Sequence, residues 1–122
     1  MEKDGIRIGF GIMGGWNQAQ AHAQFVSNLV DFDMNIQAAL DVPRFTKLSF
    51  GGCDVSVESR IAEPVRKDLA AMGHKVTALT PFAAPMGRGQ AVLRDRHGVN
   101  YAASDPRGDG SAVPEGPPVF KQ

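Results

Sequence analysis

The sequence lacks most features that would mark a specialised class of protein. Its single cysteine, Cys53, excludes an intrachain disulfide and every zinc site built from several cysteines. Its 13 basic and 13 acidic side chains cancel, so nothing in the charge attracts nucleic acid or an anionic membrane in bulk. No apolar run approaches the roughly 18 residues of a membrane span, and residues 1–5 are too polar for a signal peptide. We therefore expect a soluble chain with no nucleic-acid or membrane partner, and the compartment of any longer parent stays open.

The remaining composition is that of an ordinary folded domain. The chain has 122 residues, 43% of them hydrophobic and 21% charged, which is enough apolar surface for one packed core. Its 14 glycines and 8 prolines make it rich in turns, so short elements should dominate. We expect a domain over residues 1–110, followed by a disordered tail over the Gly- and Pro-rich residues 111–122.

Hydrophobic periodicity predicts an α/β (α+β) fold, in which helices are interspersed with a mixed sheet. Strands are predicted over residues 6–13, 76–79, 90–94 and 99–104, and a hairpin turning at Gly51-Gly52 over residues 44–58. Helices are predicted from Asn17 to about residue 30, over residues 35–40, and over residues 64–72.

Capping signals set the predicted helix ends. Asn17 with Gln20 resembles a capping box, and Asn35 should cap the second helix, which must end before Pro43. Gly73 is placed to end the third helix, whose apolar stripe is Val65, Leu69 and Met72. In the second hairpin strand, Cys53, Val55 and Val57 should face the core, while Asp54, Ser56 and Glu58 face water.

A glycine motif at the end of the first long strand admits two functional interpretations. Gly9, Gly11 and Gly14 have the G-x-G-x-x-G spacing that seats a dinucleotide pyrophosphate. That interpretation is disfavoured, because Asp31 and Asp33 follow the helix directly and no second strand precedes the next helix.

The second interpretation uses the adjacent pair Gly14-Gly15 at the start of the helix. Backbone N–H groups without neighbouring Cβ atoms can face a ligand there, and the positive end of the helix dipole favours negative charge on an oxygen, as in an oxyanion hole. A tight strand-to-helix turn with no ligand explains the same spacing equally well.

Six motifs in a fixed order carry a resemblance to a known family. Together they closely resemble the gamma-glutamyltranspeptidase family of N-terminal-nucleophile hydrolases, over about residues 5–110. The motifs are residues 11–20 (GIMGGWNQAQ), 28–35 (NLVDFDMN), 38–45 (AALDVPRF), 73–76 (GHKV), 86–92 (MGRGQAV) and 103–107 (ASDPR).

The resemblance implies a fragment of the layered αββα fold and an acyltransferase or hydrolase reaction. In that family an N-terminal Thr attacks a gamma-glutamyl amide, and a Gly-Gly pair, carried over to Gly14 and Gly15, stabilises the oxyanion. The Thr and the groups that hold the glutamyl moiety lie upstream of the matching region. The chain then resembles the C-terminal part of the small catalytic subunit, inactive alone, with the upstream part of the precursor as its partner and a small gamma-glutamyl compound as its substrate.

Met13 departs from the proline found in many transpeptidases, which leaves the acyl donor, the acceptor and the balance of hydrolysis and transfer open. The alternative is a non-catalytic α/β module that binds a small anion at the Gly14-Gly15 helix start or mediates oligomerisation.

Other residues are expected to have supporting roles. Arg44, Asp105 and Arg107 match family motifs and should form structural Arg–carboxylate pairs that fasten loops. Trp16 adjoins the glycine pair and is predicted at the rim of a substrate pocket. The spacing of His22, His74 and His97 fits no metal site, and neither a metal nor a cofactor is implied. Because a fragment would leave a sheet edge and an apolar face uncovered, we also expect self-association.

Overall fold

The protein contains two small sheets rather than the single mixed sheet that we expected. A computed structural model describes residues 1–113, so most of the predicted tail over 111–122 lies outside the described residues. The larger sheet is antiparallel, with the order β1 (Glu2–Lys3), β2 (Ile6–Met13), β6 (Arg88–Arg94) and β7 (Asn100–Ser104). The smaller sheet is mixed, with the order β3 (Phe45–Thr46), β4 (Asp54–Glu58) and β5 (Lys75–Leu79).

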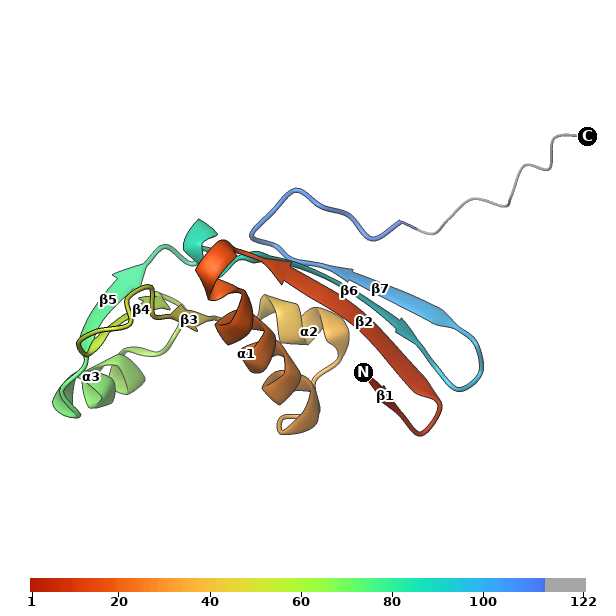
Figure 1. Ribbon diagram of the computed structural model, residues 1–122, viewed down its shortest axis with the longest axis horizontal. Helices are drawn as coiled ribbons and strands as arrows, with labels where there is room; N and C mark the ends of the chain where they lie inside the picture. The colour runs from red at the N-terminus through yellow and green to blue at the C-terminus, as the bar shows by residue number, and fades with distance from the viewer. Residues whose placement is uncertain (114–122) are drawn as a thin grey trace, which may run out of the picture.

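Two helices cover one face of the larger sheet. They are α1 (Gln18–Val30) and α2 (Ile36–Asp41), and α3 (Glu63–Ala71) accompanies the smaller sheet at the other end of the molecule (Figure 1). Short 3-10 turns, η1 (Gly15–Asn17) and η2 (Ala84–Met86), precede α1 and β6. The predicted α/β (α+β) class, with helices interspersed among strands, is confirmed.

Alternation along β2 sets the two faces of the larger sheet. Its even-numbered residues turn toward the helices, and Ile12 at the end of the strand is 2% exposed. Its odd-numbered residues face outward, where Met13 is 64% exposed and Val92, paired with Gly9, is 57% exposed. Within residues 1–113, the outer face of the sheet is therefore largely exposed, with Ala112 and Val113 beside it.

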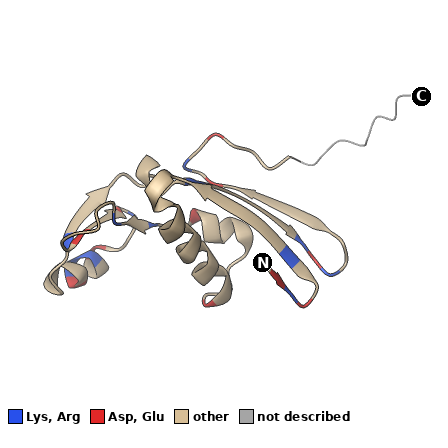
Figure 2. Ribbon diagram, viewed as in Figure 1, with Lys and Arg blue, Asp and Glu red and all other residues tan. Residues whose placement is uncertain are grey.

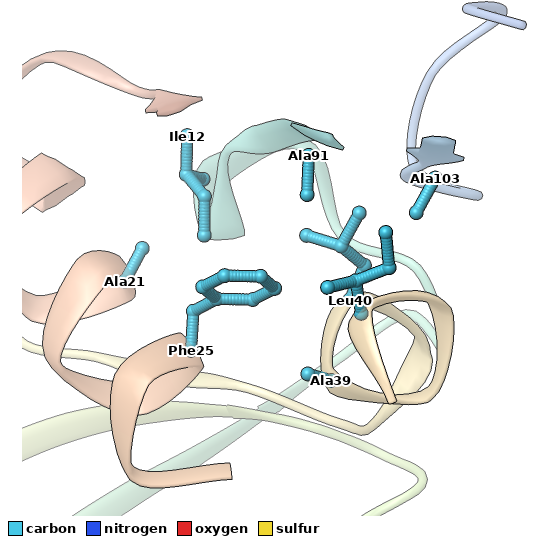
Figure 3. Packing of buried hydrophobic residues seen from close by; sticks show 8 residues of the cluster. Ile12, Ala21, Phe25, Ala39, Leu40, Ala91 and Ala103 are labelled. Carbon is cyan, nitrogen blue, oxygen red and sulfur yellow. The ribbon is translucent and has the colours of Figure 1, made fainter. Parts of the chain in front are cut away.

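The core lies between the larger sheet and the two helices that cover it. Phe25 of α1 and Leu40 of α2 meet beneath Ile12, Ala91 and Ala103 of the sheet (Figure 3). Burial of the Phe25 side chain contributes about 1.5–3 kcal/mol. Small residues on β6 and β7 bring α2 close to the sheet.

The ends of α2 follow the sequence signals. The side-chain oxygen of Asn35 accepts the N–H groups of Gln37 and Ala38 at 3.1 and 2.9 Å, and the helix ends at Asp41, before Pro43. The predicted capping box at Asn17 is wrong. Because η1 places Asn17 in helical geometry (φ −76°, ψ −14°), its side chain cannot turn back as an N-cap does, and it makes no capping bond.

Two predictions for the hairpin strand are also wrong. Cys53 is exposed rather than in the core, because the ladder begins at Asp54 and Cys53 lies in the preceding loop. Glu58 is fully buried rather than solvated, because the end of β4 enters the junction between the two sheets.

Helix α3 forms as predicted, with Pro64 in its first turn and Gly73 at φ +96° after its end. None of its residues is buried, however, and Val65 and Met72 of its apolar stripe are 49% and 76% exposed. This end of the molecule therefore lacks a covering layer within residues 1–113.

Charge is spread over the molecule in both signs. Acidic and basic residues occur together on α3 at one end and around the turns of the larger sheet at the other (Figure 2). Within residues 1–113, no helix is both long enough and apolar enough to traverse a bilayer.

Candidate functional site

The strand β2 runs into α1 through a turn of two glycines, which we call the glycine turn (residues 13–16). The carbonyl of Gly14 accepts the N–H of Asn17 at 3.1 Å, which closes the turn. Within residues 1–113, no acceptor is found for the N–H of Gly14 or of Gly15, and both residues are exposed. The turn thus presents free donors at the start of a 13-residue helix, where the helix dipole is positive.

Glycine is required at two places in and beneath this turn. Gly15 has φ +56°, a left-handed conformation, with open space where a Cβ would stand. Gly87 supports the turn from below, and a Cβ on it would collide with the carbonyl oxygen of Met13. A Cβ on Gly14 would stand only 3.2 Å from the Cα of Gly87, so the two segments touch through bare backbone.

The antiparallel sheet contradicts the dinucleotide interpretation of the glycine motif. Both neighbours of β2 in the sheet are antiparallel to it, so Gly9, Gly11 and Gly14 do not open the βαβ unit that a dinucleotide site needs.

Four charged side chains meet at the junction between the two sheets, and we call them the buried charge cluster: Arg44, Glu58, Asp105 and Arg107. Arg44 pairs with Asp105 at 2.7 Å, and Arg107 bridges Glu58 at 2.6 Å and Asp105 at 3.0 Å. Their side chains are at most 2% exposed. Two positive and two negative groups balance, which makes burial of all four tolerable.

The cluster also fastens the segment beneath the glycine turn. One guanidinium nitrogen of Arg44, Nη1, donates to the carbonyls of Met86 and Gly87, both at 3.3 Å. Oδ2 of Asp105 accepts the N–H of Gly89 at 2.9 Å. Arg44 and Asp105 therefore hold the residues on which the glycine turn lies.

The electrostatics of the cluster follow from burial and mutual hydrogen bonding. Burial by itself raises the pKa of Glu58, but hydrogen bonds from Arg107 and from the N–H groups of Arg44 and Ala83 outweigh it, and the net shift of the pKa is downward. Burial lowers the pKa of Arg44, and the nearby charge of Arg107 adds to this effect. For Arg107, burial is outweighed by hydrogen bonding to Glu58 and by the charges of Asp105 and Glu58, and its pKa is raised.

Sequence reasoning included three of the four cluster members and missed Glu58. Strand alternation placed its carboxylate in water, and no local signal contradicts that assignment. The available hint was that the three residues expected to form Arg–carboxylate pairs include two arginines, Arg44 and Arg107, and a single carboxylate, Asp105, whereas each buried arginine needs a carboxylate.

Asn17 lies directly behind the glycine turn. It is 1% exposed, and within residues 1–113 neither its amide nitrogen nor its amide oxygen has a hydrogen-bond partner. A buried amide without partners costs about 1–3 kcal/mol. The buried amide of Asn17 therefore lowers the free energy of unfolding.

Trp16 stands out from the glycine turn and is 83% exposed. The ring of Phe50 meets it edge to face, with centroids 6.2 Å apart and planes at 86°. Phe50 belongs to the loop of residues 47–53 between β3 and β4, which brings a distant segment beside the glycine turn.

His22, on α1, packs against strand β2. Nε2 of His22 accepts the N–H of Ile12 at 2.9 Å, and its ring contacts Phe10 edge to face. Among residues 1–113, no three His, Cys, Asp or Glu side chains gather as a metal site would require.

Comparison with known proteins places this geometry in context. Residues 1–115 match the family described as Gamma-glutamyltranspeptidase. The chain is 30% identical over 110 residues to the "Glutathione hydrolase-like YwrD proenzyme" of Bacillus subtilis, covering 88% of this chain and 21% of that protein. It is also 30% identical over 113 residues to the "Oxamate amidohydrolase proenzyme" of Klebsiella pneumoniae, covering 90% and 21%.

A solved structure, cephalosporin acylase from Bacillus halodurans, is similar at 39% identity with a TM-score of 0.78, covering 88% of this chain and 20% of that one. The chain thus spans about a fifth of the length of these relatives.

Proposed function

Because the chain belongs to the gamma-glutamyltranspeptidase family, we propose that it is the C-terminal portion of an enzyme that transfers or hydrolyses gamma-glutamyl or related acyl amides, with Gly14 and Gly15 as its oxyanion hole. The observation that carries this proposal is the pair of N–H groups on the exposed residues Gly14 and Gly15, just ahead of α1, for which residues 1–113 supply no acceptor. Such donors are worth most when they point at charge that develops in the transition state.

In the proposed reaction, a hydroxyl supplied by the upstream part of the precursor attacks the amide carbonyl. The carbonyl oxygen becomes an oxyanion and accepts hydrogen bonds from Gly14 and Gly15. The amine then leaves with a proton, and the acyl group stays on the nucleophile as an ester. Water or a second amine attacks this ester, which gives hydrolysis or transfer.

The chain by itself supplies the donors and not the nucleophile. The mechanism needs a hydroxyl residue whose own free α-amino group acts as base, and internal residues such as Thr46 cannot offer one. We expect no hydrolysis of a gamma-glutamyl anilide by the isolated chain, and turnover above a heat-killed control would contradict this assignment.

The open outer face of the larger sheet supports a partner role for the upstream part. Met13 and Val92 are more than half exposed on it, and β7 is an edge strand. Without that part, the chain should self-associate through this face. Light scattering over a concentration series tests this, and a strict monomer at hundreds of micromolar would refute it.

The oxyanion assignment is tested in the full-length enzyme by Gly15→Ala, with Gly73→Ala as the matched control. Both glycines have positive φ and open space at the Cβ position, so both variants bear backbone strain; Gly73, at φ +96°, lies further from the allowed left-handed region than Gly15, at φ +56°, which makes it a stringent control. Gly15→Ala places a methyl group where the oxyanion must approach and should lower kcat about a hundredfold. Gly73→Ala should leave kcat unchanged. Equal kcat values for the two variants would mean that Gly15 only makes a turn.

A further inference from the structure

We propose that Trp16, Leu48 and Phe50 form an apolar subsite that receives an aromatic or aliphatic substituent of the amide substrate. The proposal depends on the proposed function of Gly14 and Gly15, because the subsite is defined by its place beside them. The subsite specifies which class of amide the enzyme takes, which the type of reaction does not.

The three side chains surround a hollow at the edge of the glycine turn. The hollow measures about 160 Å³, and Gln20, Lys47 and Ser49 complete its lining. Trp16 follows Gly15 directly in the chain, with Cα atoms ~3.8 Å apart, so a substituent of an amide bound at Gly15 has only a short distance to span to the hollow that Trp16 lines. A dry protein cavity of about 150 Å³ holds one benzene molecule, so the hollow suits a single ring.

The loop that carries Leu48 and Phe50 is fastened at both ends. The side-chain amide of Gln20 on α1 bonds the backbone of Lys47 twice, at 2.8 and 2.9 Å. Across the loop, Oδ1 of Asp54 accepts Nζ of Lys47 at 2.9 Å and Oγ of Ser49 at 2.7 Å.

These bonds fix the backbone on both sides of Phe50, which is itself 96% exposed. A loop fastened in this way loses less conformational entropy when its aromatic ring binds a ligand.

The charges around the hollow disfavour a carboxylate as its ligand. Among residues 1–113, Lys47 is the one cation that lines the hollow, and its ammonium group is already paired with Asp54 and bonded to the carbonyl of Gly51. Hydrogen bonds from Lys47 and Ser49 also lower the pKa of Asp54 to about 2, so this pairing persists at neutral pH. The polar side chains of Gln20 and Ser49 are bonded to Lys47 and Asp54, which leaves the indole, phenyl and isobutyl groups as the unpaired lining and favours an apolar ligand group.

The chain offers a direct probe, because Trp16 is its only tryptophan. Its indole N–H gives a single resonance in a nitrogen-15 NMR spectrum, which can be followed while a small amide is added. Phenylacetamide carries the ring on the acyl side, acetanilide carries it on the amine side, and acetamide has no ring. We expect a saturable shift with at least one of the two aromatic amides and none with acetamide. The amide that binds more tightly identifies the side of the scissile bond that the subsite serves.

Two variants decide whether the aromatic pair is responsible. Phe50→Ala removes the edge-to-face partner and should weaken binding about three- to tenfold. Phe32→Ala removes another exposed phenylalanine, 66% exposed after the end of α1, and should leave binding unchanged. The proposal is overturned if acetamide shifts the indole resonance as strongly as the aromatic amides, if neither aromatic amide shifts it, or if both variants bind like the parent chain.

Kinetics of the full-length enzyme separate this proposal from the function on which it depends. Phe50→Ala should raise KM for an aromatic amide substrate and leave a ring-free analogue unaffected, whereas Gly15→Ala should lower kcat for both. If the enzyme hydrolyses neither a gamma-glutamyl anilide nor its ring-free analogue, the proposed function fails, while the indole shift still shows whether the subsite binds a ring. If both substrates respond equally to Phe50→Ala, the subsite fails and the oxyanion assignment stands.

Discussion

Removal of Arg107 should be among the most damaging single changes to the fold. Its guanidinium donates five hydrogen bonds, to both oxygens of Glu58, to Asp105, and to the carbonyls of Leu40 and Val42, and its side chain has no exposed surface. Arg107→Met keeps most of the aliphatic stem but leaves two buried carboxylates. Within residues 1–113, Arg44 is then the only buried cation, and the partly exposed Arg60 still pairs with Glu58 at 3.1 Å.

Loss of one partner from a buried ion pair typically costs about 3–5 kcal/mol. A domain of this size has a free energy of unfolding of about 5–15 kcal/mol, so the variant should lose a large part of it. With a urea m-value of about 1–3 kcal/mol/M, the unfolding midpoint should fall by on the order of 2 M. Far-UV circular dichroism is the suitable readout, because the exposed Trp16 reports poorly on the core.

The control is Lys67→Met, which breaks the exposed pair between Lys67 and Glu63 on α3, 2.8 Å apart with both side chains more than half exposed. It should cost only about 0.3–0.5 kcal/mol. Adding Glu58→Gln to Arg107→Met should recover part of the loss, because it removes a buried carboxylate whose one remaining charged partner within residues 1–113 is the partly exposed Arg60, at 3.1 Å. If the two single variants unfold at the same urea concentration, the cluster does not stabilise the junction and this reasoning is wrong.

Three further outcomes follow from single contacts. Hydrogen bonds from Lys47 and Ser49 lower the pKa of Asp54 from 3.8 to about 2; a lowered pKa means that the ionised tether stabilises the fold above pH 3.8 and is lost as the pH falls through about 2. A carbon-13 NMR titration of the Asp54 carboxyl checks this, and a midpoint near 3.8 would contradict it. Asn17→Leu keeps the shape of the side chain and removes the unpartnered amide, so the free energy of unfolding should rise by about 1 kcal/mol; a fall would indicate that a bound water satisfies the amide. Gly87→Ala should lower the thermal midpoint by several degrees, because its methyl group meets the carbonyl of Met13, whereas Gly51→Ala, which meets nothing within 4 Å, should not.

Much of the local structure could be predicted because its causes are local. The alternation of Ile6, Ile8, Phe10 and Ile12 gives a strand with one buried face, and Asn35 caps α2 through bonds to N–H groups two and three residues away. The glycine turn is likewise a short-range feature, since its two glycines and the following helix are adjacent in the chain.

Predictions that needed the surroundings of a residue were less reliable. Alternation placed Cys53 inside and Glu58 in water, and both assignments are wrong, because alternation gives relative faces and says neither where a ladder begins nor what lies beyond each face. Asn17 had the right residue type for a cap, but the preceding 3-10 turn gave it helical angles that exclude the capping bond.

The sequence by itself therefore determined the order of the elements, the glycine pair and the family motifs, because each depends on residues close together in the chain. The tertiary structure alone decided that Glu58 meets Arg107, 49 positions away, and that Phe50 stands beside Trp16. The physical reason is that packing of the two sheets brings these side chains together. A buried carboxylate is stable only where that packing also delivers an arginine.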